Sequence, residues 1–312
     1  MTAPSFPFSR VGLVGFGLMG GSLARDLKGL RDAPEVLALS ADPEEVELGR
    51  RAGLVDRLPE TPEALCQRAD LVVYATPLEA TLRLLEEHQP HWGKETVVTD
   101  VVSLKAPLAR AMDELGASRR YVGSHPMAGG EGSGFVSSRA GLFQGARVWL
   151  TSTGASKPVQ EKVAGFWSAL EAVPSWTRPP AHDRLMVWVS HLPQLLANAL
   201  ALALEEEGIP LDDLGTGGRD MTRLAGSDPG MWRDLFRHAP EDLPRALEAL
   251  EGQVRRLRGV LEEENVGAVA EVMEETRAWW RGPGAGEREG AGHEEPGTGG
   301  SRTPEETEEE WS

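Results

Sequence analysis

Three residues of this sequence carry side chains that could move a proton or hold an acid. His125 lies in Gly123–Glu131, directly after a predicted strand. A histidine with its ordinary near-neutral pKa suits a general base that takes a hydroxyl proton while hydride leaves. Arg219 and Arg223 lie in a polar stretch, and guanidinium groups pair carboxylates through two hydrogen bonds. The pattern predicts a proton acceptor and a carboxylate clamp; a structural loop histidine and an exposed, salt-bridged helix pair are the alternatives.

No set of metal ligands stands out along the chain. His182 and His191 are nine residues apart, so they need not share one helix face. The one cysteine, Cys66, belongs to no CxxC or Cys/His cluster and can form no intrachain disulfide. We therefore predict no metal and a reducing, cytoplasmic setting.

A glycine-rich turn follows the first predicted strand. Gly15, Gly17 and Gly20 come directly after an apolar run, and a helical pattern begins at Ser22. In this context the first glycine permits a tight turn, the second lets a pyrophosphate approach the backbone, and the third lets the helix pack on the sheet. The helix N-terminus then faces the phosphates. The turn predicts a bound dinucleotide, and a turn that merely packs is the alternative.

The second predicted strand ends where a ribose-reading acid is expected. That position holds Ser40, whose hydroxyl does not repel a 2′-phosphate, and Asp42 follows two residues later. Asp42 could accept the ribose hydroxyl, and no arginine follows at once to pair a phosphate. This slightly favours NAD over NADP. The alternative for Asp42 is an N-cap of the helix that begins at Pro43.

These residues must be positioned by an α/β fold. Apolar, β-rich runs alternate with amphipathic helical stretches up to about Leu150, and runs that do not alternate in polarity suit strands buried on both faces. We therefore expect a parallel sheet of the Rossmann type, with strands at Val11–Gly15, Val36–Leu39, Leu71–Ala75, Val97–Asp100, Tyr121–Ser124 and Val148–Thr151. Thr76, Pro77 and Ser103 follow strands and would lie at the ligand-binding edge.

The second half of the chain is predicted to be helical. Proline and charge cluster at Val173–Asp183, and periodic helical patterns follow at Asp183–Glu207 and Pro240–Arg258. We expect a dinucleotide-binding domain over residues 1–176 and an all-α domain over 177–282. Residues 283–312 hold nine Glu against two Arg and predict a disordered acidic tail.

Composition excludes several classes of partner. The net charge of −17, without a basic patch, argues against nucleic acid. The longest apolar run, Leu192–Leu204, has 13 residues, short of the roughly 20 that a membrane span needs, so we interpret it as a buried helix. The N-terminus has no apolar signal-peptide core, so secretion and membrane partners are not expected.

Taken together, these motifs resemble those of the prephenate dehydrogenases. The resemblance covers residues 10 to about 280 and rests on the glycine turn, Ala75–Pro77, Asp100–Lys105, His125–Gly129, Ser190–Pro193 and Arg219–Asp234. It implies an NAD(P)-dependent oxidative decarboxylation of prephenate or arogenate in tyrosine biosynthesis. It also implies a helical dimerisation domain, a homodimer, and an active site between the two domains.

The resemblance also implies roles for single residues. His125 matches a catalytic histidine that bonds the ring hydroxyl, and Ser103 matches a serine that places that hydroxyl and the cofactor. Arg223 matches an arginine that pairs a substrate carboxylate, and Glu131 matches a glutamate that gates the pocket. The remaining substrate residues would be Arg219, Asp220, His191, Gln194 and Trp232. The cofactor would contact Gly15, Phe16, Gly17, Leu18, Met19, Gly20, Ser40, Asp42, Thr76, Pro77 and Ser103.

The sequence departs from the family pattern at two positions. Gln194 stands where many relatives have a second histidine, and Gly130 stands where a small hydroxyl residue is common. Prephenate and arogenate are not separated by the sequence. A β-hydroxyacid dehydrogenase would normally use a lysine in its helical half, whereas no lysine lies beyond Lys162. A non-catalytic dinucleotide sensor, the other alternative, would not need His125 beside the arginines.

Overall fold

A computed structural model describes residues 6–130, 132–239, 241–263 and 266–282. The chain divides into two compact units, Met1–Leu247 and Glu248–Ser312. The predicted boundary after residue 176 falls inside the first unit and stays a prediction. Glu131 and the predicted acidic tail lie outside the described residues.

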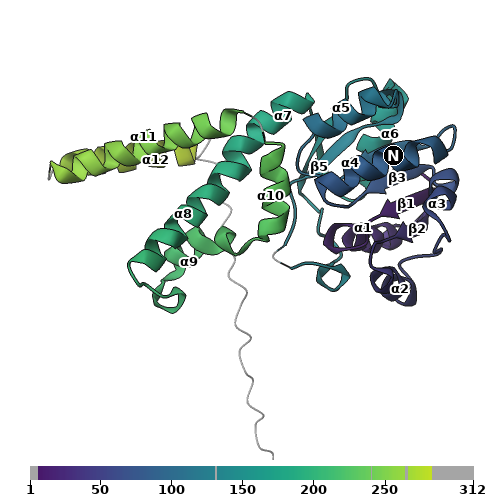
Figure 1. The fold of residues 1–312 in the computed structure, drawn as a ribbon, viewed down its shortest axis with the longest axis horizontal. Coiled ribbons are helices and arrows are strands. Elements are labelled where there is room, and N and C mark those ends of the chain that lie inside the picture. The colour runs from purple at the N-terminus through teal and green to yellow at the C-terminus, as the bar shows by residue number, and fades with distance from the viewer. Residues whose placement is uncertain (1–5, 131, 240, 264–265, 283–312) are drawn as a thin grey trace, which may run out of the picture. The chain divides into compact units, whose positions relative to one another are not determined.

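The first four strands of the chain form a parallel sheet (Figure 1). Its order is β2-β1-β3-β4, and its strands are β1 (Arg10–Val14), β2 (Glu35–Leu39), β3 (Leu71–Tyr74) and β4 (Val97–Asp100). The apolar strands β3 and β4 are buried throughout, as expected for strands covered on both faces. Helices connect and cover them: α1 (Leu18–Gly29), α2 (Pro43–Arg51), α3 (Pro62–Arg68), α4 (Leu78–His88), the 3-10 helix η1 (Gln89–His91) and α5 (Ala106–Glu114). The predicted α/β fold class is confirmed.

A second, three-stranded sheet follows and differs from the prediction. It contains β5 (Gly123–Pro126), β6 (Arg147–Thr151) and β7 (Val173–Thr177), with β5 antiparallel to β6 and β6 parallel to β7. The chain that enters β5 still forms a parallel bridge with β4, between Tyr121 and Val98. The expectation that all six strands run parallel is therefore wrong from β6 onward, where the direction reverses. A short apolar run has the same pattern in either direction, and among the described residues between the two strands the one helical element is the 3-10 helix η3 (Phe135–Ser137). β7 was not predicted because its Pro174 indicated a boundary.

The predicted long helix is present with an irregularity at its centre. α7 (Pro179–Met186) continues through a π-helical turn, η4 (Val187–His191), into α8 (Leu192–Glu206). A π-helical turn within a helix is frequent at functional sites. The whole segment spans 28 residues and contains a window with a mean hydropathy of 1.4, of which 33% is buried. It is long and apolar enough to cross a membrane by those two measures alone, which core helices of soluble proteins also meet.

The expectation of a buried helix over Leu192–Leu204 is wrong for part of that run, because Leu192 is buried whereas Leu202 is 59% exposed. Before this run, Leu185 and Val189 are also 38% and 50% exposed. The apolar stripe therefore extends beyond what this chain covers by itself. Such a stripe needs another surface against which to bury.

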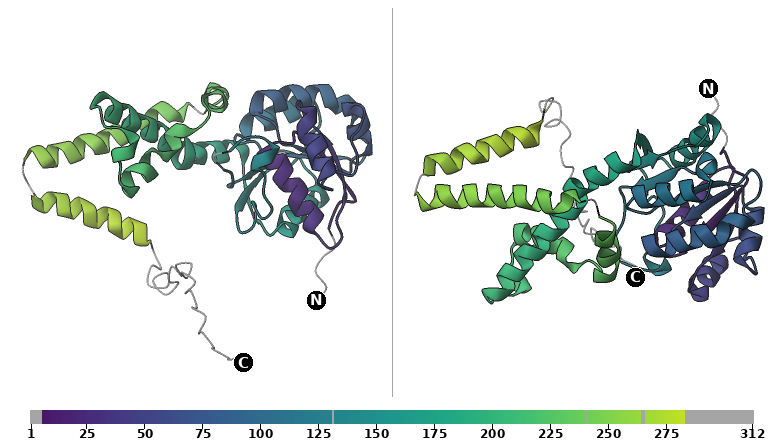
Figure 2. Two further views of the ribbon diagram at one scale, coloured as in Figure 1. Left: turned by 90° about the horizontal axis from the view of Figure 1, so that it is seen from below. Right: turned by 45° about the horizontal axis from the view of Figure 1, so that its top comes forward.

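The remaining helices complete the two units. They are α6 (Lys157–Ala169) and the 3-10 helices η2 (Ser118–Arg120), η5 (Leu211–Asp213) and η6 (Arg223–Gly226), with α9 (Thr216–Thr222), α10 (Pro229–Arg237), α11 (Asp242–Glu262) and α12 (Val266–Arg281). α11 and α12 run side by side (Figure 2), and Arg256 donates to Glu275 between them at 3.1 Å.

Two apolar cores hold the first unit together. One lies against α1 and α6 and includes Phe16, Phe135 and Trp167. The other lies against α3, α4 and α5, and Leu235 of α10 belongs to it. Because α10 shares that core with the four-stranded sheet, it is held near the edge where β3 and β4 end.

Candidate active site

The glycine turn between β1 and α1 has the geometry expected for a pyrophosphate site. Gly15 has a φ of +95°, which favours glycine, and a Cβ there would overlap the carbonyl oxygen of Ala75. A Cβ on Gly20 would overlap the carbonyl oxygen of Gly15. At Gly17, by contrast, the nearest atom to such a Cβ is the Cα of Gly134, 3.8 Å away. Packing explains Gly15 and Gly20. At Gly17 a Cβ would make only ordinary van der Waals contact, so packing does not require glycine there, and the close approach of a phosphate to the backbone is the remaining reason for it.

The other predicted residues of this turn differ in what they can contact. The Phe16 side chain is fully buried and stacks on Phe135 with ring centroids 5.2 Å apart. Its side chain therefore serves the core, and only its backbone can face a ligand. Leu18 lies near Gly130, where an added Cβ would be 3.8 Å from the Leu18 side chain. The structure thus places part of the post-β5 segment next to the start of α1.

A crevice at the carboxyl edge of the sheet brings several predicted residues together. Its cavity of about 240 Å³ is lined by Met19, Thr76, Pro77 and Ser103, together with Ala75, Leu78, Val101, Val102, Leu104, Met231, Asp234 and Leu235. α10 therefore forms one wall. Open α/β sheets bind their ligands at this edge. Met231, which lies in the Arg219–Asp234 motif without having been predicted as a site residue, and Leu235, which follows that motif, lie at the helical spacing that marks one face of α10.

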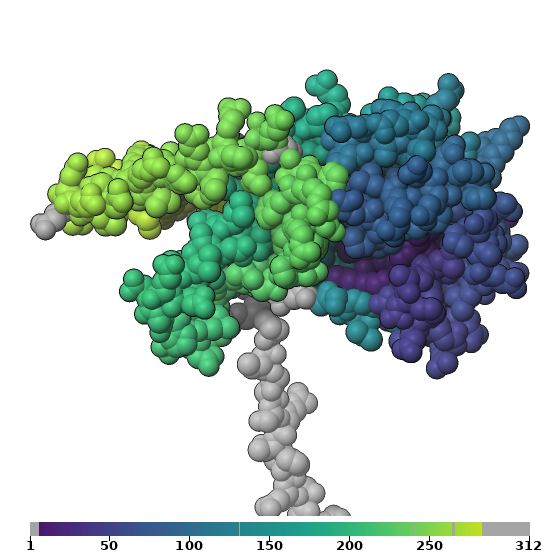
Figure 3. Space-filling model, in the orientation of Figure 1, coloured from purple at the N-terminus to yellow at the C-terminus, as the bar shows by residue number. Residues whose placement is uncertain are grey.

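α10 is also joined to α4 by charged side chains. His238 and Arg237 lie 2.8 and 3.3 Å from Oε1 of Glu79, in the first turn of α4. Figure 3 shows the surfaces of these two helices in contact. The interaction holds the pKa of the Glu79 carboxyl below its usual range, chiefly through the hydrogen bond with His238.

His125 stands at the head of a buried chain of hydrogen bonds. Its Nδ1 lies 3.0 Å from Nε2 of His182, and Nδ1 of His182 lies 2.7 Å from Oδ1 of Asp183. Because a carboxylate oxygen only accepts, Nδ1 of a neutral His182 donates and its Nε2 accepts from His125. Nε2 of His125 is then left with its lone pair. The chain thus presents an oriented proton acceptor.

Asp183 is itself fixed by the backbone. The amides of Lys105 and Ala106 donate to its two oxygens, each at 2.8 Å. These amides lie at the start of α5, where an anion is favoured by the helix dipole. The segment after β4 therefore positions the acid that orients the two histidines.

Burial and a nearby cation keep His125 neutral. Burial is the largest cause that lowers the pKa of His125 well below its ordinary value, and the charge of Lys105 is the next. Lys105 is fully buried, pairs with Asp100 and donates to the carbonyl oxygen of Ser124 at 2.6 Å. Tyr121 donates to the other oxygen of Asp100 at 2.7 Å. His125 retains some accessible surface, so it can meet a ligand while remaining unprotonated.

His191 and Trp232 leave polar atoms without partners. Among the described residues, both ring nitrogens of His191 and the indole Nε1 of Trp232 are buried and make no hydrogen bond. The two rings meet edge to face with centroids 6.0 Å apart. Burial lowers the pKa of His191 to about 4, and the charges of Asp183 and His182 also act on it. Unpaired buried polar groups are costly, so these atoms favour a polar ligand beside them.

The predicted substrate residues around η6 differ in burial: some are buried or bonded to the backbone and others are exposed. Gln194 is buried and donates to the carbonyl oxygen of Leu224 at 2.7 Å, so its amide holds η6 against α8. Arg219 is half exposed and donates to the carbonyl oxygens of Leu214 and Asp212. Asp220 and Arg223 are exposed. In this structure Gln194 and Arg219 contact the protein's own backbone.

The predicted ribose residues also have partners within the chain. Asp42 accepts from the amide of Glu44 at 2.9 Å and is the N-cap of α2, which confirms that interpretation. Ser40 donates to Glu45 at 3.2 Å and accepts from the amide of Asp42 at 3.2 Å. Glu45 was missed because its place in the sequence, inside a helix, gave no signal.

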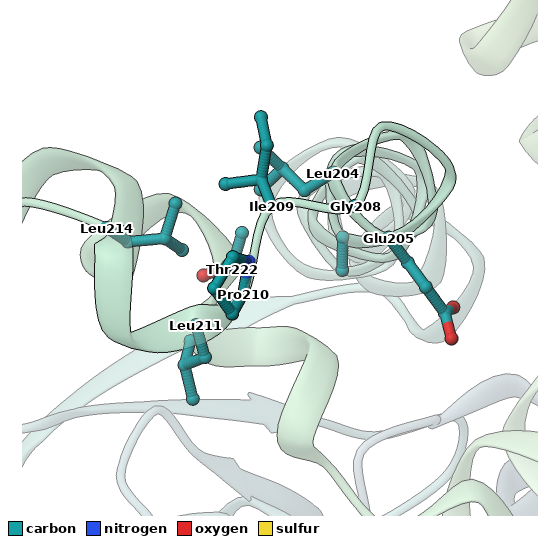
Figure 4. Close-up of a pocket in the computed structure, with 9 residues that line it drawn as sticks. Leu204, Glu205, Gly208, Ile209, Pro210, Leu211, Leu214 and Thr222 are labelled. Atoms are coloured by element: carbon teal, nitrogen blue, oxygen red, sulfur yellow. The ribbon is translucent and has the colours of Figure 1, made fainter.

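Another cavity lies away from these groups. It has a volume of about 420 Å³ between the end of α8 and α9, and it is lined mainly by apolar side chains such as those of Leu204, Ile209 and Leu214 (Figure 4). It contains none of the predicted site residues. Within the described part of the chain, no group of three or more His, Cys, Asp or Glu residues is arranged to hold a metal ion.

The turn, the crevice and the oriented histidine define a dinucleotide-dependent dehydrogenase with a helical second half. Residues 23–174 match the family model for the prephenate dehydrogenase nucleotide-binding domain, and residues 178–275 match the model for its dimerization domain. The chain belongs to the prephenate dehydrogenase family. Neither the β-hydroxyacid dehydrogenase nor the sensor alternative is favoured.

Similar proteins come from several bacteria. The chain is 30% identical to the prephenate dehydrogenase of Bacillus subtilis strain 168 over 81% of its own length and 70% of that protein. A solved structure of prephenate dehydrogenase from Aquifex aeolicus, in complex with hydroxyphenyl propionate and NAD+, superposes with a TM-score of 0.80 at 29% identity and covers 88% of this chain and 98% of that one. Synechocystis arogenate dehydrogenase superposes with a TM-score of 0.74 at 25% identity, covering 90% and 99%.

Proposed function

We propose that this protein catalyses the NAD-dependent oxidative decarboxylation of prephenate to 4-hydroxyphenylpyruvate, or of arogenate to tyrosine. The observation that carries the proposal is the His125–His182–Asp183 chain, which holds a neutral imidazole in a protein of this family. In the reaction the ring hydroxyl loses a proton, its carbon loses a hydride and the ring carboxylate leaves as carbon dioxide. The electron pair left by the carbon dioxide makes the ring aromatic, and the oxygen regains a proton to give the phenol. Aromatisation supplies the driving force, so the protein needs mainly to position its reactants.

His125 serves as the proton acceptor. Its unprotonated Nε2 takes the hydroxyl proton, and the resulting positive charge is stabilised through His182 by the buried carboxylate of Asp183. The positive charge of Lys105 repels the charge that forms on His125, and the ion pair of Lys105 with Asp100 weakens that repulsion. The carboxylates of Asp100 and Asp183 thus compensate the buried positive charges of this region.

The dinucleotide fits the turn and the crevice. The backbone of Gly15–Gly20 would hold the pyrophosphate, and Met19, Thr76, Pro77 and Ser103 would enclose the nicotinamide end. When bound, NAD accepts the hydride. The apolar crevice wall contributed by α10 would exclude water from that end.

The substrate is held from the helical half. The indole N–H of Trp232 and the ring nitrogens of His191 supply hydrogen-bonding groups that need partners. Arg223 would pair a substrate carboxylate, and Arg219 and Asp220 in the same segment would line or order that region. Gln194 acts on this set by holding η6, which begins at Arg223.

We also infer a homodimer that works in the cytoplasm. Leu185 and Val189 expose an apolar stripe on the helix that runs into α8, and the matching family model describes this region as a dimerization domain. A second copy would cover the stripe. Light scattering of the purified protein at micromolar concentration should give twice the chain mass, and a monomer would contradict the inference.

An initial-rate assay tests the proposed reaction. Purified protein is mixed with prephenate or arogenate and with NAD or NADP, and absorbance at the reduced-nicotinamide band is followed. Turnover of at least one substrate with NAD, with one carbon dioxide released per NADH, is expected. Absence of turnover in all four mixtures, despite measurable NAD binding, would contradict the proposal.

A further inference from the structure

The end of β2 lacks the acid that usually reads the adenosine ribose. In dinucleotide-binding folds an Asp or Glu there accepts a hydrogen bond from the 2′-hydroxyl and repels a 2′-phosphate. Ser40 holds that place in this chain, and the nearby Asp42 is used as the N-cap of α2. Neither residue by itself explains a preference for NAD.

Glu45 brings a carboxylate to this place from α2. Its Oε2 accepts from the Ser40 hydroxyl at 3.2 Å, and its Oε1 accepts from the amide of Phe135 at 2.8 Å. A Cβ built on Gly134 would lie 3.0 Å from Oε1, and the Cα of Gly134 would itself lie 3.8 Å from a Cβ built on Gly17 in the glycine turn. The carboxylate is therefore fixed between the end of β2 and the segment that borders the glycine turn.

The other two glutamates of α2 are not fixed at this place. Glu47 pairs with Arg50 and Arg51 in its own helix, and Glu44 is exposed. Glu45 is half-buried, and each of its oxygens accepts one hydrogen bond in the structure. A carboxylate oxygen can accept a second, so the group keeps capacity for ribose hydroxyls.

We propose that Glu45, oriented by Ser40, reads the adenosine ribose and makes the protein prefer NAD to NADP. The proposal deepens the proposed function, since it concerns the same dinucleotide site. A 2′-phosphate would bring about two negative charges next to a half-buried carboxylate, where screening by solvent is reduced. The unphosphorylated ribose instead donates a hydrogen bond to a charged acceptor.

Calorimetric titration of the full chain with NAD and with NADP, without substrate, tests this role. Wild type should bind NAD at least about tenfold more tightly than NADP, as expected for one charge-assisted hydrogen bond. Glu45→Gln keeps the acceptor for the Phe135 amide but loses the charge. It should reduce the ratio of the two dissociation constants by about tenfold. The matched control, Glu44→Gln, should leave the ratio unchanged.

The outcomes separate ribose reading from a structural role. If Glu45 only anchors Gly134 and Phe135, the variant weakens both dinucleotides equally and the ratio stays constant, which overturns the proposal. A wild type that binds NADP as tightly as NAD also overturns it. If Glu45→Gln does not fold, as judged by thermal melting, Ser40→Ala replaces it, because it frees the carboxylate without removing the charge. Ser40→Ala should weaken the binding of NAD about threefold without a matching loss of NADP affinity. An equal loss of affinity for both dinucleotides would refute the role of Glu45.

The test is independent of the reaction. Preferential NAD binding without turnover of prephenate or arogenate would contradict the proposed function and leave the role of Glu45 intact. Turnover by wild type, together with an unchanged ratio of the NAD and NADP dissociation constants in Glu45→Gln, would support the proposed function and contradict the role of Glu45.

Discussion

Replacing Asp183 by Asn should make His125 a poor proton acceptor while leaving the imidazole ring of His125 in place. Asp183 accepts three hydrogen bonds, from His182 and from the amides of Lys105 and Ala106. An Asn side chain has one acceptor oxygen and one donor group at its end, so one backbone N–H then faces another donor. That mismatch should lower the free energy of unfolding by about 1–3 kcal/mol.

The larger effect should be on turnover. Without the carboxylate, the positive charge that forms on His125 and His182 lies beside Lys105 with less compensation. An oriented acid–base group typically contributes 10²–10⁴-fold, so we expect kcat to fall roughly 10²–10³-fold, or about 3–4 kcal/mol in the barrier. The NAD dissociation constant should change little, because Asp183 does not line the crevice.

Steady-state kinetics, NAD titration and thermal melting of the same preparation measure these effects. Asp113→Asn is the matched control, because Asp113 is an exposed carboxylate that accepts from the hydroxyls of Ser118 and Thr153. It should keep wild-type kcat. A folded Asp183→Asn variant with kcat within about threefold of wild type would refute the relay, given the usual size of such contributions.

Three further predictions concern the same site. Because the pKa of His125 is depressed, its neutral form prevails at and above pH 6.5. A pH profile of wild-type kcat/KM should therefore fall only where the pH drops through that depressed pKa, and a fall centred above pH 7 would contradict the assignment. Trp232→Phe keeps the edge-to-face packing and loses the N–H, so KM for the substrate should rise about tenfold with NAD affinity unchanged; an unchanged KM would remove Trp232 from the substrate site. Gly17→Ala should fold normally and weaken NAD binding in a titration, whereas Gly20→Ala should lower the melting temperature because its Cβ overlaps Gly15; the reverse order would contradict the geometry of the turn.

Much of the fold could be predicted from local pattern. The first four strands carry apolar runs that only a sheet covered on both faces would bury, and the glycine turn has fixed spacing after β1. Strand direction is not a local property, which is why the antiparallel pairing of β5 and β6 was not predicted. β7 was hidden by its proline.

The candidate site was predictable only in part, because its key contacts join distant segments. His125 was identified from its place after the predicted strand Tyr121–Ser124, although the structure places it inside β5. Its partner His182 lies 57 residues away, and nothing in the sequence indicated that pairing. Glu45 lies 90 residues from Phe135, whose amide helps to fix it. Such contacts depend on how helices pack against the sheet, which spacing along the chain does not reveal.

The turnover of His125→Asn tests the central claim most directly, because that variant retains a smaller polar side chain but not the basic nitrogen. With prephenate and saturating NAD, kcat should fall by roughly 10²–10⁴-fold while the NAD dissociation constant stays within about twofold of wild type. A folded His125→Asn protein that retains kcat within about tenfold of wild type would show that another group accepts the proton, and it would contradict the assignment of His125.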